Sequence, residues 1–538
     1  MNEPTGRRRL TRRTAIAALA GAGVGVGAVE LYSISAPPTG SKNLGRIGDI
    51  DGKPLPLPAL SPRPEFDANL PWSAKGGAIN DASALSETPV YGIVRVTEEK
   101  HVAGALAFAR ANGLKVSVAA VRHSMGGHAF DDNALVLDMR AFNQVIVKPE
   151  AMTMTVQPGA VWHDIQNVLH PKFAVKAMQS SDIFSVGGSI SVNAHGMDHR
   201  AGSVLGSLRS IRLMKADGTI VPCSPTENVE LFRHVVGGYG LFGVILSAEL
   251  EIVPNAVYRT SRKVIAAADF RQVFAAEIEA DENLGLFYGH LSTAPGSLLE
   301  QMILYRYDRV ADAPPADQLP LGEPGAVWAK RMMLNLAKKG DWFREMKWYA
   351  EKNVEERVES CTVARTAAMG EGEACLVTRN DPMHDSVPYL FNRLNADTDI
   401  LHEYFFPRAA YVAMMDGVRE IFRRTGANLL NASLRVVHAE DTALSYSHAP
   451  SFSLVLYINQ STDDAGNAAM RALTRELIDL TLANGGRFFL PYQLHYTGKQ
   501  LLASYPELPA FLAVKDQHDP NGLFTSTWYR AVRLLAAA

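Results

Sequence analysis

The fold is indicated most clearly by one loop, Arg122-His123-Ser124-Met125-Gly126-Gly127-His128, which follows the apolar run Val116 to Val121. A run of this kind is typical of a strand, and the loop places a basic residue, an imidazole and paired glycines at the end of that strand. Such a loop can hold a phosphorylated cofactor, and its imidazole can also react with that cofactor. The combination points to a flavin.

The residues around this loop predict short strands mixed with helices. Apolar runs predict strands over 91–96, 116–121, 135–139, 145–147 and 152–156. The spacing of apolar residues predicts helices over 98–112 and 161–169. Because the strands are short and do not alternate regularly with helices, the expected fold class is α+β.

A second glycine-rich segment runs from Ser185 to Gly196 and reads Ser-Val-Gly-Gly-Ser-Ile-Ser-Val-Asn-Ala-His-Gly. Small residues at this density let backbone N–H groups approach a pyrophosphate, and short hydroxyls can donate to its oxygens. A tight turn packed against a helix is the alternative interpretation of this segment.

A third segment, Gly238 to Gly243, matches the GxGxxG pattern of dinucleotide-binding proteins. That pattern requires a helix directly after it, whereas residues 244–253 alternate like a strand. We therefore reject a Rossmann unit and expect a glycine-rich turn between a helix and a strand, close to a cofactor.

The composition allows a large core and gives no reason to expect nucleic acid. With 538 residues, 47% of them hydrophobic, the chain is too long for one ordinary domain, and two are expected. Its formal net charge of −3 indicates no basic surface for nucleic acid. The three cysteines, Cys223, Cys361 and Cys375, are too far apart for a disulfide framework or a CxxC metal site.

Residues 1–38 resemble a twin-arginine export signal of bacteria. Thr11-Arg12-Arg13 precedes an uncharged stretch, Ala15 to Val29, which is shorter than the ~20 residues of a membrane-spanning helix. The signal implies the twin-arginine export machinery as a partner and a periplasmic or extracellular location, with a membrane tether if the signal stays uncleaved. A disordered basic tail is the alternative. Residues 39–87 are expected to form a linker or wrapping loop.

Residues 88–255 resemble the FAD-binding domain of the vanillyl-alcohol oxidase family, which is of the p-cresol methylhydroxylase (PCMH) type and has two subdomains. The resemblance places His123 where that family links the flavin covalently to histidine. Arg122 stands where glycine is usual, and serines fill the region of the cysteine found in doubly linked members. FAD with at most one covalent bond, through His123, is therefore implied. The implied cofactor-binding residues are Val121, Arg122, His123, Ser124, Met125, Gly126, Gly127, Ser180, Ser185, Gly188, Ser189, Val192, Gly243 and Val244.

Residues 256–538 resemble the substrate-binding cap of sugar-1,4-lactone and alditol oxidases. The resemblance implies an antiparallel sheet flanked by helices and a C-terminal segment that returns to the flavin; residues 314–380 are extra to it. It also implies Arg435 and Lys499 as catalytic residues, since a cation near the alkoxide or the reduced ring lowers the barrier. The implied substrate-binding residues are Ser180, Glu403, Arg435, His495 and Lys499.

Two positions in the cap depart from the alditol oxidases. Ser433 replaces a glutamate, and Ile458 stands where a threonine is usual. These changes favour a small-molecule substrate that is larger or less polar than a simple alditol.

The expected function is oxidation of a CH–OH group by hydride transfer to flavin N5, in an exported sugar, aldonolactone or alditol oxidase similar to D-arabinono-1,4-lactone oxidase. Molecular oxygen would be reduced to hydrogen peroxide. One alternative is a dehydrogenase of amines or other alcohols, similar to cytokinin dehydrogenases, with another acceptor. The other is an exported metal-binding protein that uses His123, His128, His195 and His199, although Asp198 is the sole acidic partner nearby.

Overall fold

The computed structural model describes residues 64–85, 87–313, 315–319, 321–322, 327–353, 376–387 and 396–537. The predicted export signal, the first part of the predicted linker, Cys361 and Cys375 lie outside these residues. Within the described residues, no helix is long and apolar enough to cross a membrane.

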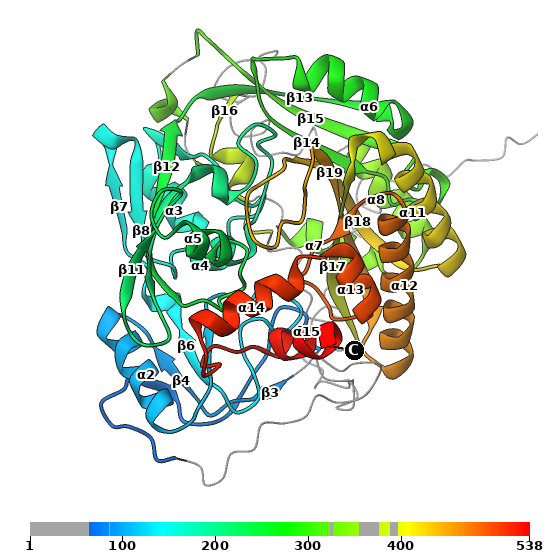
Figure 1. Cartoon of the computed structure of the whole chain (residues 1–538). Helices are drawn as coiled ribbons and strands as arrows, with labels where there is room; N and C mark the ends of the chain where they lie inside the picture. Colours follow the sequence, from blue (N-terminus) through cyan, green and yellow to red (C-terminus); the bar gives the residue numbers. More distant parts are fainter. Residues whose placement is uncertain are drawn as a thin grey trace, which may run out of the picture.

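The first part of the FAD-binding region is a four-stranded sheet with a helix against it (Figure 1). Its strand order is β1-β4-β6-β5, and both β4 and β5 pair with β6 in parallel. Helix α2 packs on the sheet because Val102, Ala105, Leu106 and Ala109 fall on one face and are buried. The elements are β1 (Trp72–Ala74), β4 (Gly92–Arg95), α2 (Glu99–Ala111), β5 (Val116–Ala119) and β6 (Leu135–Asp138). A separate pair of strands, β2 (Ala78–Ile79) and β3 (Thr88–Pro89), lies between β1 and β4 in the chain.

The second part is an antiparallel sheet of order β11-β10-β12-β8-β7, with β9 paired to β12. Helix α5 ends at Val235 and β12 begins at Val244, so the turn 238–243 leads into a strand and the rejection of a Rossmann unit is confirmed. Where the glycine content indicated a loop, residues 186–192 form a short helix, α4. The elements are β7 (Val145–Lys148), β8 (Thr153–Val156), α3 (Trp162–Leu169), β9 (Phe173–Val175), α4 (Val186–Val192), β10 (Leu208–Met214), β11 (Ile220–Cys223), α5 (Val229–Val235) and β12 (Val244–Pro254).

The cap is built on an eight-stranded antiparallel sheet of order β16-β13-β15-β14-β18-β19-β17-β20. Helices α11 and α12 pack together beside it, on the side away from the FAD-binding strands (Figure 1). Its elements are β13 (Val257–Ala266), α6 (Phe270–Val273), β14 (Leu284–Leu291), β15 (Gln301–Arg309), α7 (Val327–Ala337), α8 (Asp341–Asn353), β16 (Leu376–Thr378), β17 (Asp397–Pro407), α11 (Tyr411–Thr425), β18 (Asn428–Val437), β19 (Ser451–Ser461), α12 (Asp464–Ala483) and β20 (Arg487–Phe488). The α+β fold with an antiparallel cap sheet is confirmed.

The strand register shows which cap residues share one face of this sheet. Glu403 lies opposite Val455, Val455 opposite Ser433, and Ser433 opposite His290. Directly opposed residues point to the same side, and so do residues two apart along a strand. Glu403, Ser433 and Arg435 therefore face the same way. Ile458 lies opposite Ile400 and faces the other way, so the position expected to change the substrate pocket is not on the site face.

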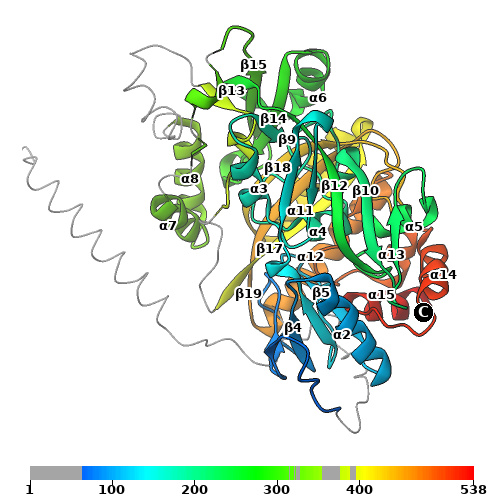
Figure 2. The same ribbon diagram turned by 90° about the vertical axis from the view of Figure 1, so that its left-hand side faces the viewer.

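The extra segment contributes the hairpin of α7 and α8, which lies at the edge of the molecule in Figure 2. Trp348 packs 5.8 Å from the ring of His290, and Lys338 donates to Asp399 at 2.7 Å. Because His290 shares the face of Glu403, the hairpin covers part of the face that carries the predicted substrate residues.

The C-terminal helices α13 (Gly498–Ser504), α14 (Leu508–His518) and α15 (Thr527–Ala537) bring the chain back to the first sheet. Phe524 forms a parallel bridge with Val116, and the Ser117 hydroxyl donates to the Thr525 carbonyl at 2.7 Å. Asp519 accepts the backbone N–H groups of Leu523 and Phe524, which fixes the turn before this bridge. The C-terminal segment thus lies beside β5, the strand that leads into the His123 loop (Figure 2).

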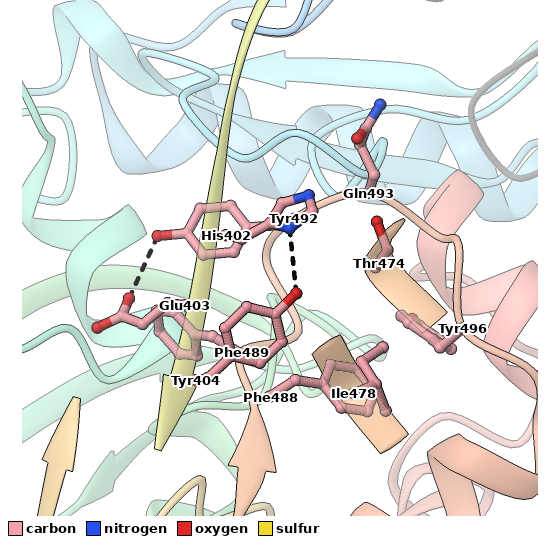
Figure 3. Close-up of a pocket in the computed structure, with 10 residues that line it drawn as sticks. All are labelled: His402, Glu403, Tyr404, Thr474, Ile478, Phe488, Phe489, Tyr492, Gln493 and Tyr496. Atoms are coloured by element: carbon pink, nitrogen blue, oxygen red, sulfur yellow. Dashed lines mark hydrogen bonds between the residues drawn. The ribbon is translucent and has the colours of Figure 1, made fainter. Parts of the chain in front are cut away.

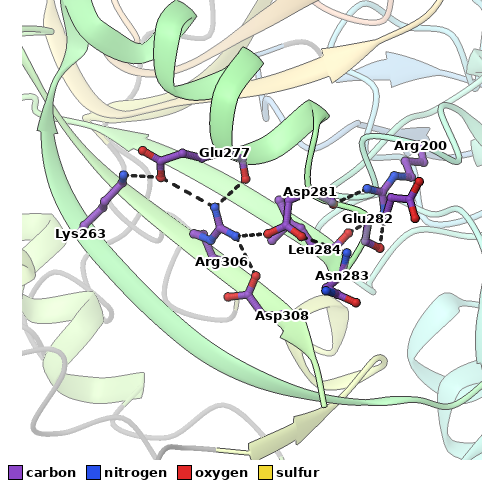
Figure 4. Close-up of polar contacts among 9 residues, drawn as sticks. All are labelled: Arg200, Lys263, Glu277, Asp281, Glu282, Asn283, Leu284, Arg306 and Asp308. Carbon is purple, nitrogen blue, oxygen red and sulfur yellow. Dashed lines mark hydrogen bonds and ion pairs between the residues drawn. The ribbon is translucent and has the colours of Figure 1, made fainter. Parts of the chain in front are cut away.

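Polar contacts tie the FAD-binding domain to the far end of the cap. Arg200, in the loop after α4, donates to the carbonyls of Leu284 at 2.7 Å and Asp281 at 2.5 Å. The Asp281 carboxylate accepts from Arg306 on β15 at 2.6 Å, and Arg306 also donates to Asp308 at 2.8 Å (Figure 4). The turn before β14 is therefore held by arginines of both domains.

Candidate functional site

The turn after β5 needs an unusual backbone conformation at Arg122. Its φ angle is +57°, which L side chains rarely adopt, and this explains why glycine is usual at the corresponding position. A Cβ added to Gly126 would lie 2.4 Å from the carbonyl oxygen of Tyr492, so the loop passes close against the cap. The Met125 N–H donates to the Pro491 carbonyl at 2.8 Å. Residues 125–126 of the cofactor loop are therefore in direct contact with residues 491–492 of the cap.

The two histidines of this loop have different surroundings. His123 is partly exposed, lies 5.2 Å from the ring of Phe184, and its pKa is lowered to about 4 by burial. His128 is stacked 5.0 Å from the ring of Trp528 and lies 5.4 Å from that of Tyr239. His123 is thus neutral near pH 7, the state in which imidazole is a nucleophile, whereas His128 packs among aromatic rings.

The glycine-rich segment begins with a capped helix. The Ser185 hydroxyl accepts the Gly188 N–H at 3.4 Å, and Gly188 itself is exposed. The Ser189 hydroxyl, predicted to bind the cofactor, instead donates to Gln179 at 2.8 Å and accepts from Trp162 at 2.9 Å. The Ser189 hydroxyl is thus used inside the domain, and the cofactor contact of Ser189 stays a prediction.

Three other predicted cofactor residues can be placed. Val192 packs against the aromatic cluster of Phe405, Tyr446 and Phe489. Gly243 has a φ of +152°, and a Cβ there would lie 2.6 Å from the Met214 carbonyl oxygen. Val244 is buried opposite Met214 in the sheet, so its side chain serves the core and only its backbone remains for a cofactor.

Glu403 is the centre of a buried polar cluster that joins the two domains, and Figure 3 shows its hydrogen bond with Tyr492. Its Oε1 accepts from His195 Nε2 at 2.6 Å and from the Ser453 hydroxyl at 2.5 Å, and its Oε2 accepts from the Tyr492 hydroxyl at 3.2 Å. Burial raises the pKa of Glu403, but His195, Ser453 and Arg435 outweigh burial and hold the pKa below its usual value. Glu403 is therefore an ionised carboxylate fixed by residues of both domains.

Arg435 is a cation on the same face of the cap sheet. Its guanidinium lies 6.0 Å from the ring centre of Tyr288, and its buried Nε has no hydrogen-bond partner in the described part of the chain. Its charge acts on Glu403 and on Tyr492, which places it beside the Glu403 cluster. An arginine in this position can bind an anionic or polar group of a substrate.

The predicted loop from His495 to Lys499 lies elsewhere. Thr497 and Gln500 form a capping box at the start of α13, and Lys499 is exposed on that helix. His495 is buried near His402, Arg471 and Arg475, and burial lowers its pKa to about 3. His402 precedes Glu403 and so faces the other side of the sheet. The structure therefore does not bring Lys499 and His495 to the Glu403 cluster, and their catalytic and substrate-binding roles stay predictions.

Three residues of the cluster were missed by the sequence analysis. His195 was visible as a histidine in the glycine-rich segment, but only the fold pairs it with a carboxylate from the cap. Ser453 lies opposite Arg435 on the neighbouring strand. Tyr492 carries no sequence signal, and its place next to the His123 loop follows from the contact of residue 491 with Met125.

The histidines proposed as metal ligands do not converge. Among the described residues, the group with ligand atoms close enough for a metal is His163, Asp182 and His384, which includes none of the four. His128 and His195 instead make the contacts given above, and His199 packs 5.5 Å from the ring of Phe287. The metal-binding hypothesis therefore has no support in this part of the chain.

The residues brought together fit FAD. His123 offers a neutral imidazole, and Ser180 has a buried hydroxyl with no hydrogen-bond partner within the described residues. Arg122, in its left-handed turn, offers a guanidinium that can pair with a phosphate group, whereas the backbone N–H groups of residues 186–189 are already paired within the domain. His123 would be the residue that meets the flavin ring.

Comparison with known proteins agrees with this assignment. Residues 90–224 match the family model of an FAD binding domain. The chain is 24% identical to the decaprenylphosphoryl-β-D-ribose oxidase of Mycolicibacterium smegmatis over 84% of this chain and 95% of that protein. It is 31% identical to the L-gulonolactone oxidase of Mus musculus over 28% of this chain and 34% of that protein. It is 28% identical to the D-arabinono-1,4-lactone oxidase of Yarrowia lipolytica over 41% of this chain and 40% of that protein.

An FAD-binding domain joined to a cap with an ionised carboxylate and a cation on one face defines an FAD-dependent oxidoreductase. The expected FAD cofactor is thereby confirmed. The relatives are FAD-linked oxidoreductases, which is consistent with a PCMH-type FAD-binding domain as in the vanillyl-alcohol oxidase family. The chain spans nearly the whole length of the first relative and less than half of the two lactone oxidases.

Proposed function

We propose that the protein oxidises a CH–OH group of a sugar-derived alcohol or lactone and passes the electrons to molecular oxygen, forming hydrogen peroxide. The observation that carries the proposal is the Glu403 cluster with Arg435 beside it, whose Tyr492 lies against the His123 loop. The names of the relatives, a ribose-derivative oxidase and two sugar-lactone oxidases, support a sugar-like substrate.

The chemistry needs an electron acceptor and a polar site for the alcohol. FAD supplies the acceptor for the hydride that leaves the carbon. The Tyr492 hydroxyl, which donates to Glu403 at 3.2 Å, orients the substrate hydroxyl; as Tyr492 accepts the proton of the substrate hydroxyl, its own proton moves to the Glu403 carboxylate. Arg435 stabilises the negative charge that grows on the substrate oxygen, because it has no carboxylate at ion-pair distance within the described residues. His195 and Ser453 keep Glu403 in place.

The proposed substrate class rests on the residues that line the same face of the cap sheet as Glu403 and Arg435. Ser433 stands beside Arg435, and Tyr457 faces the site in place of Ile458. Tyr457 donates to Asp399 and packs with Leu334 of α7, so this end of the face presents an aromatic ring beside the Lys338–Asp399 ion pair. We therefore propose a substrate with a polar reacting end and a larger or less polar remote part than an alditol.

We also propose a covalent bond between FAD and His123, and export of the protein through the twin-arginine machinery. The lowered pKa of His123 supports the first point, since the neutral imidazole is the nucleophilic form. Thr11-Arg12-Arg13 and the short apolar stretch after it support the second. The periplasmic or extracellular location is part of this proposal.

Acid precipitation and an oxygen electrode test the proposal together. Yellow colour that stays in the acid pellet of the wild type and leaves it in His123→Ala is expected for the covalent bond. A panel of sugars, sugar-1,4-lactones, alditols and amines should then give oxygen uptake with equal peroxide for a sugar-like alcohol. Turnover only with an artificial dye acceptor, or only with amines, would contradict the oxidase and favour a dehydrogenase.

A further inference from the structure

Residues Asp81 to Leu85 lie before the matched FAD-binding residues 90–224 and were expected to be part of a linker. They instead run between the His123 loop and strand β17 of the cap, with Asp81, Ser83 and Leu85 buried. We name this segment, Asp81 to Leu85, the clasp.

The clasp holds the cofactor loop at both of its ends. The Ala82 N–H donates to the carbonyl of Arg122 at 3.0 Å, just before His123. Beyond His123, the Gly127 N–H donates to Oδ2 of Asp81 at 3.1 Å. The loop that carries His123 is therefore anchored on either side of the histidine by neighbouring residues of one segment.

Ser83 orients the Asp81 carboxylate for this role. Its other oxygen, Oδ1, accepts from the Ser83 N–H at 3.0 Å and from the Ser83 hydroxyl at 2.6 Å. These two bonds fix the rotation of the carboxylate and leave Oδ2 directed at Gly127. Burial raises the pKa of Asp81 to about 6, whereas its hydrogen bonds and the nearby Arg122 favour the charged form.

The same segment contacts the cap. The Thr398 hydroxyl of β17 donates to the Ser83 carbonyl at 2.6 Å. Leu85 packs with Met125 and Ile400, and the Leu401 N–H contacts the sulfur of Met125 at 3.4 Å. The clasp, the cofactor loop and the strand that carries Glu403 are thus packed against one another.

Two left-handed residues meet in this arrangement. Ala84 has a φ of +55° and Arg122 a φ of +57°. Residues with a Cβ hold this conformation only where their surroundings fix it, and such strain collects at functional sites. The contacts of Ala82 and Ser83 supply that restraint. The same hydrogen bonds therefore hold the two left-handed residues and anchor the loop.

We propose that the clasp sets the conformation of the FAD-binding loop, and that Asp81 is a positioning residue that acts on FAD through Gly127 and His123. The inference concerns FAD binding alone and holds whether or not the substrate is a sugar-like alcohol. It assigns a function to a segment outside the matched FAD-binding residues.

The sharpest variant is Asp81→Asn, which keeps the volume and changes the hydrogen-bonding groups. An amide oxygen can still accept both bonds from Ser83, but the amide nitrogen, a donor, must then face the N–H of Gly127. The bond to Gly127 is therefore lost while the clasp keeps its own turn. Asp399→Asn is the matched control, since Asp399 is also a buried aspartate with a raised pKa but pairs with Lys338.

The experiment measures FAD per protein chain in acid-denatured wild type, Asp81→Asn and Asp399→Asn, in both pellet and supernatant, and the affinity of apoprotein for added FAD. Loss of a hydrogen bond to a charged group predicts FAD binding about 10- to 100-fold weaker in Asp81→Asn. If the wild type holds FAD covalently, the fraction of linked chains should fall instead. The control should keep the wild-type FAD content.

Wild-type FAD content, linkage and affinity in a folded Asp81→Asn would overturn the proposal. If Asp81→Asn does not fold, Thr398→Val removes the tie to the cap without touching Asp81. Faster loss of FAD from Thr398→Val on dialysis supports the proposal, and an unchanged rate overturns it. A chain that oxidises no alcohol but loses FAD with Asp81→Asn would refute the proposed function and leave the clasp supported.

Discussion

Replacing Glu403 with glutamine tests the polar cluster directly. The amide oxygen can accept the bonds from His195 and Ser453, so the cluster should keep its shape. The amide nitrogen would then face the Tyr492 hydroxyl, and both the negative charge and the bond from Tyr492 would be lost. Glutamine is therefore a change of charge at nearly constant geometry.

The size of the effect follows from the bond that is lost. A hydrogen bond to a charged group contributes about 1.5–3 kcal/mol. At about 1.4 kcal/mol for each factor of ten, reduction of FAD by substrate should slow by about 10- to 150-fold. Ser453→Ala, which removes one donor but keeps the carboxylate, should slow the same step by less than about tenfold.

The assay is anaerobic single-turnover reduction of the bound FAD, followed by the loss of its visible absorbance, with the best substrate from the panel. FAD content and thermal unfolding measured on the same samples control for damage to the fold. Reduction of Glu403→Gln at the wild-type rate, with full FAD content, would refute the role given to this carboxylate.

Four further outcomes are expected. Arg435→Met should lower kcat/KM by about 100-fold or more, because a charge at the reacting oxygen is lost, and added guanidinium should restore part of it in steady-state assays. His123→Ala should release all FAD on acid precipitation while the chain still folds, as judged by circular dichroism. Arg122→Gly should raise the free energy of unfolding by up to about 1 kcal/mol, since glycine adopts a φ of +57° without strain, and an unchanged or lower denaturation midpoint would contradict this. The pKa of Asp81 is raised to about 6 in the folded protein, so the folded state binds this proton more tightly; stability from this group should rise as pH falls from 7 through 6, and Asp81→Asn should remove that rise in urea unfolding.

The sequence predicted the elements that local patterns control. The strand 116–119, the helix 99–111 and the turn into β12 lie where apolar spacing and glycine placed them. The expected class of fold and the FAD cofactor are confirmed as well. They could be predicted because three glycine-rich segments of different form are a specific combination. Each of these segments sets the backbone conformation only near itself, so it can be recognised in a single sequence.

The site in the cap could be predicted only in part. Glu403 and Arg435, which the resemblance to the related caps implied, lie on strands of one sheet and point to the same side of it. His495 and Lys499 lie in the segment that forms the capped start of α13, away from the Glu403 cluster. His195 and Tyr492 join the cluster through contacts between distant segments, which no local pattern reports.

The pairing of Phe524 with Val116 has a consequence for the order of events during biosynthesis. The Ser117 hydroxyl finds its acceptor 408 residues later in the chain, and Arg530 reaches back to Asp131. The edge of the first sheet beside β5 is therefore incomplete while the ribosome is still making the cap. Stable capture of the cofactor by the His123 loop should follow translation of residues 523–530, which makes loading of this protein a late, post-translational step.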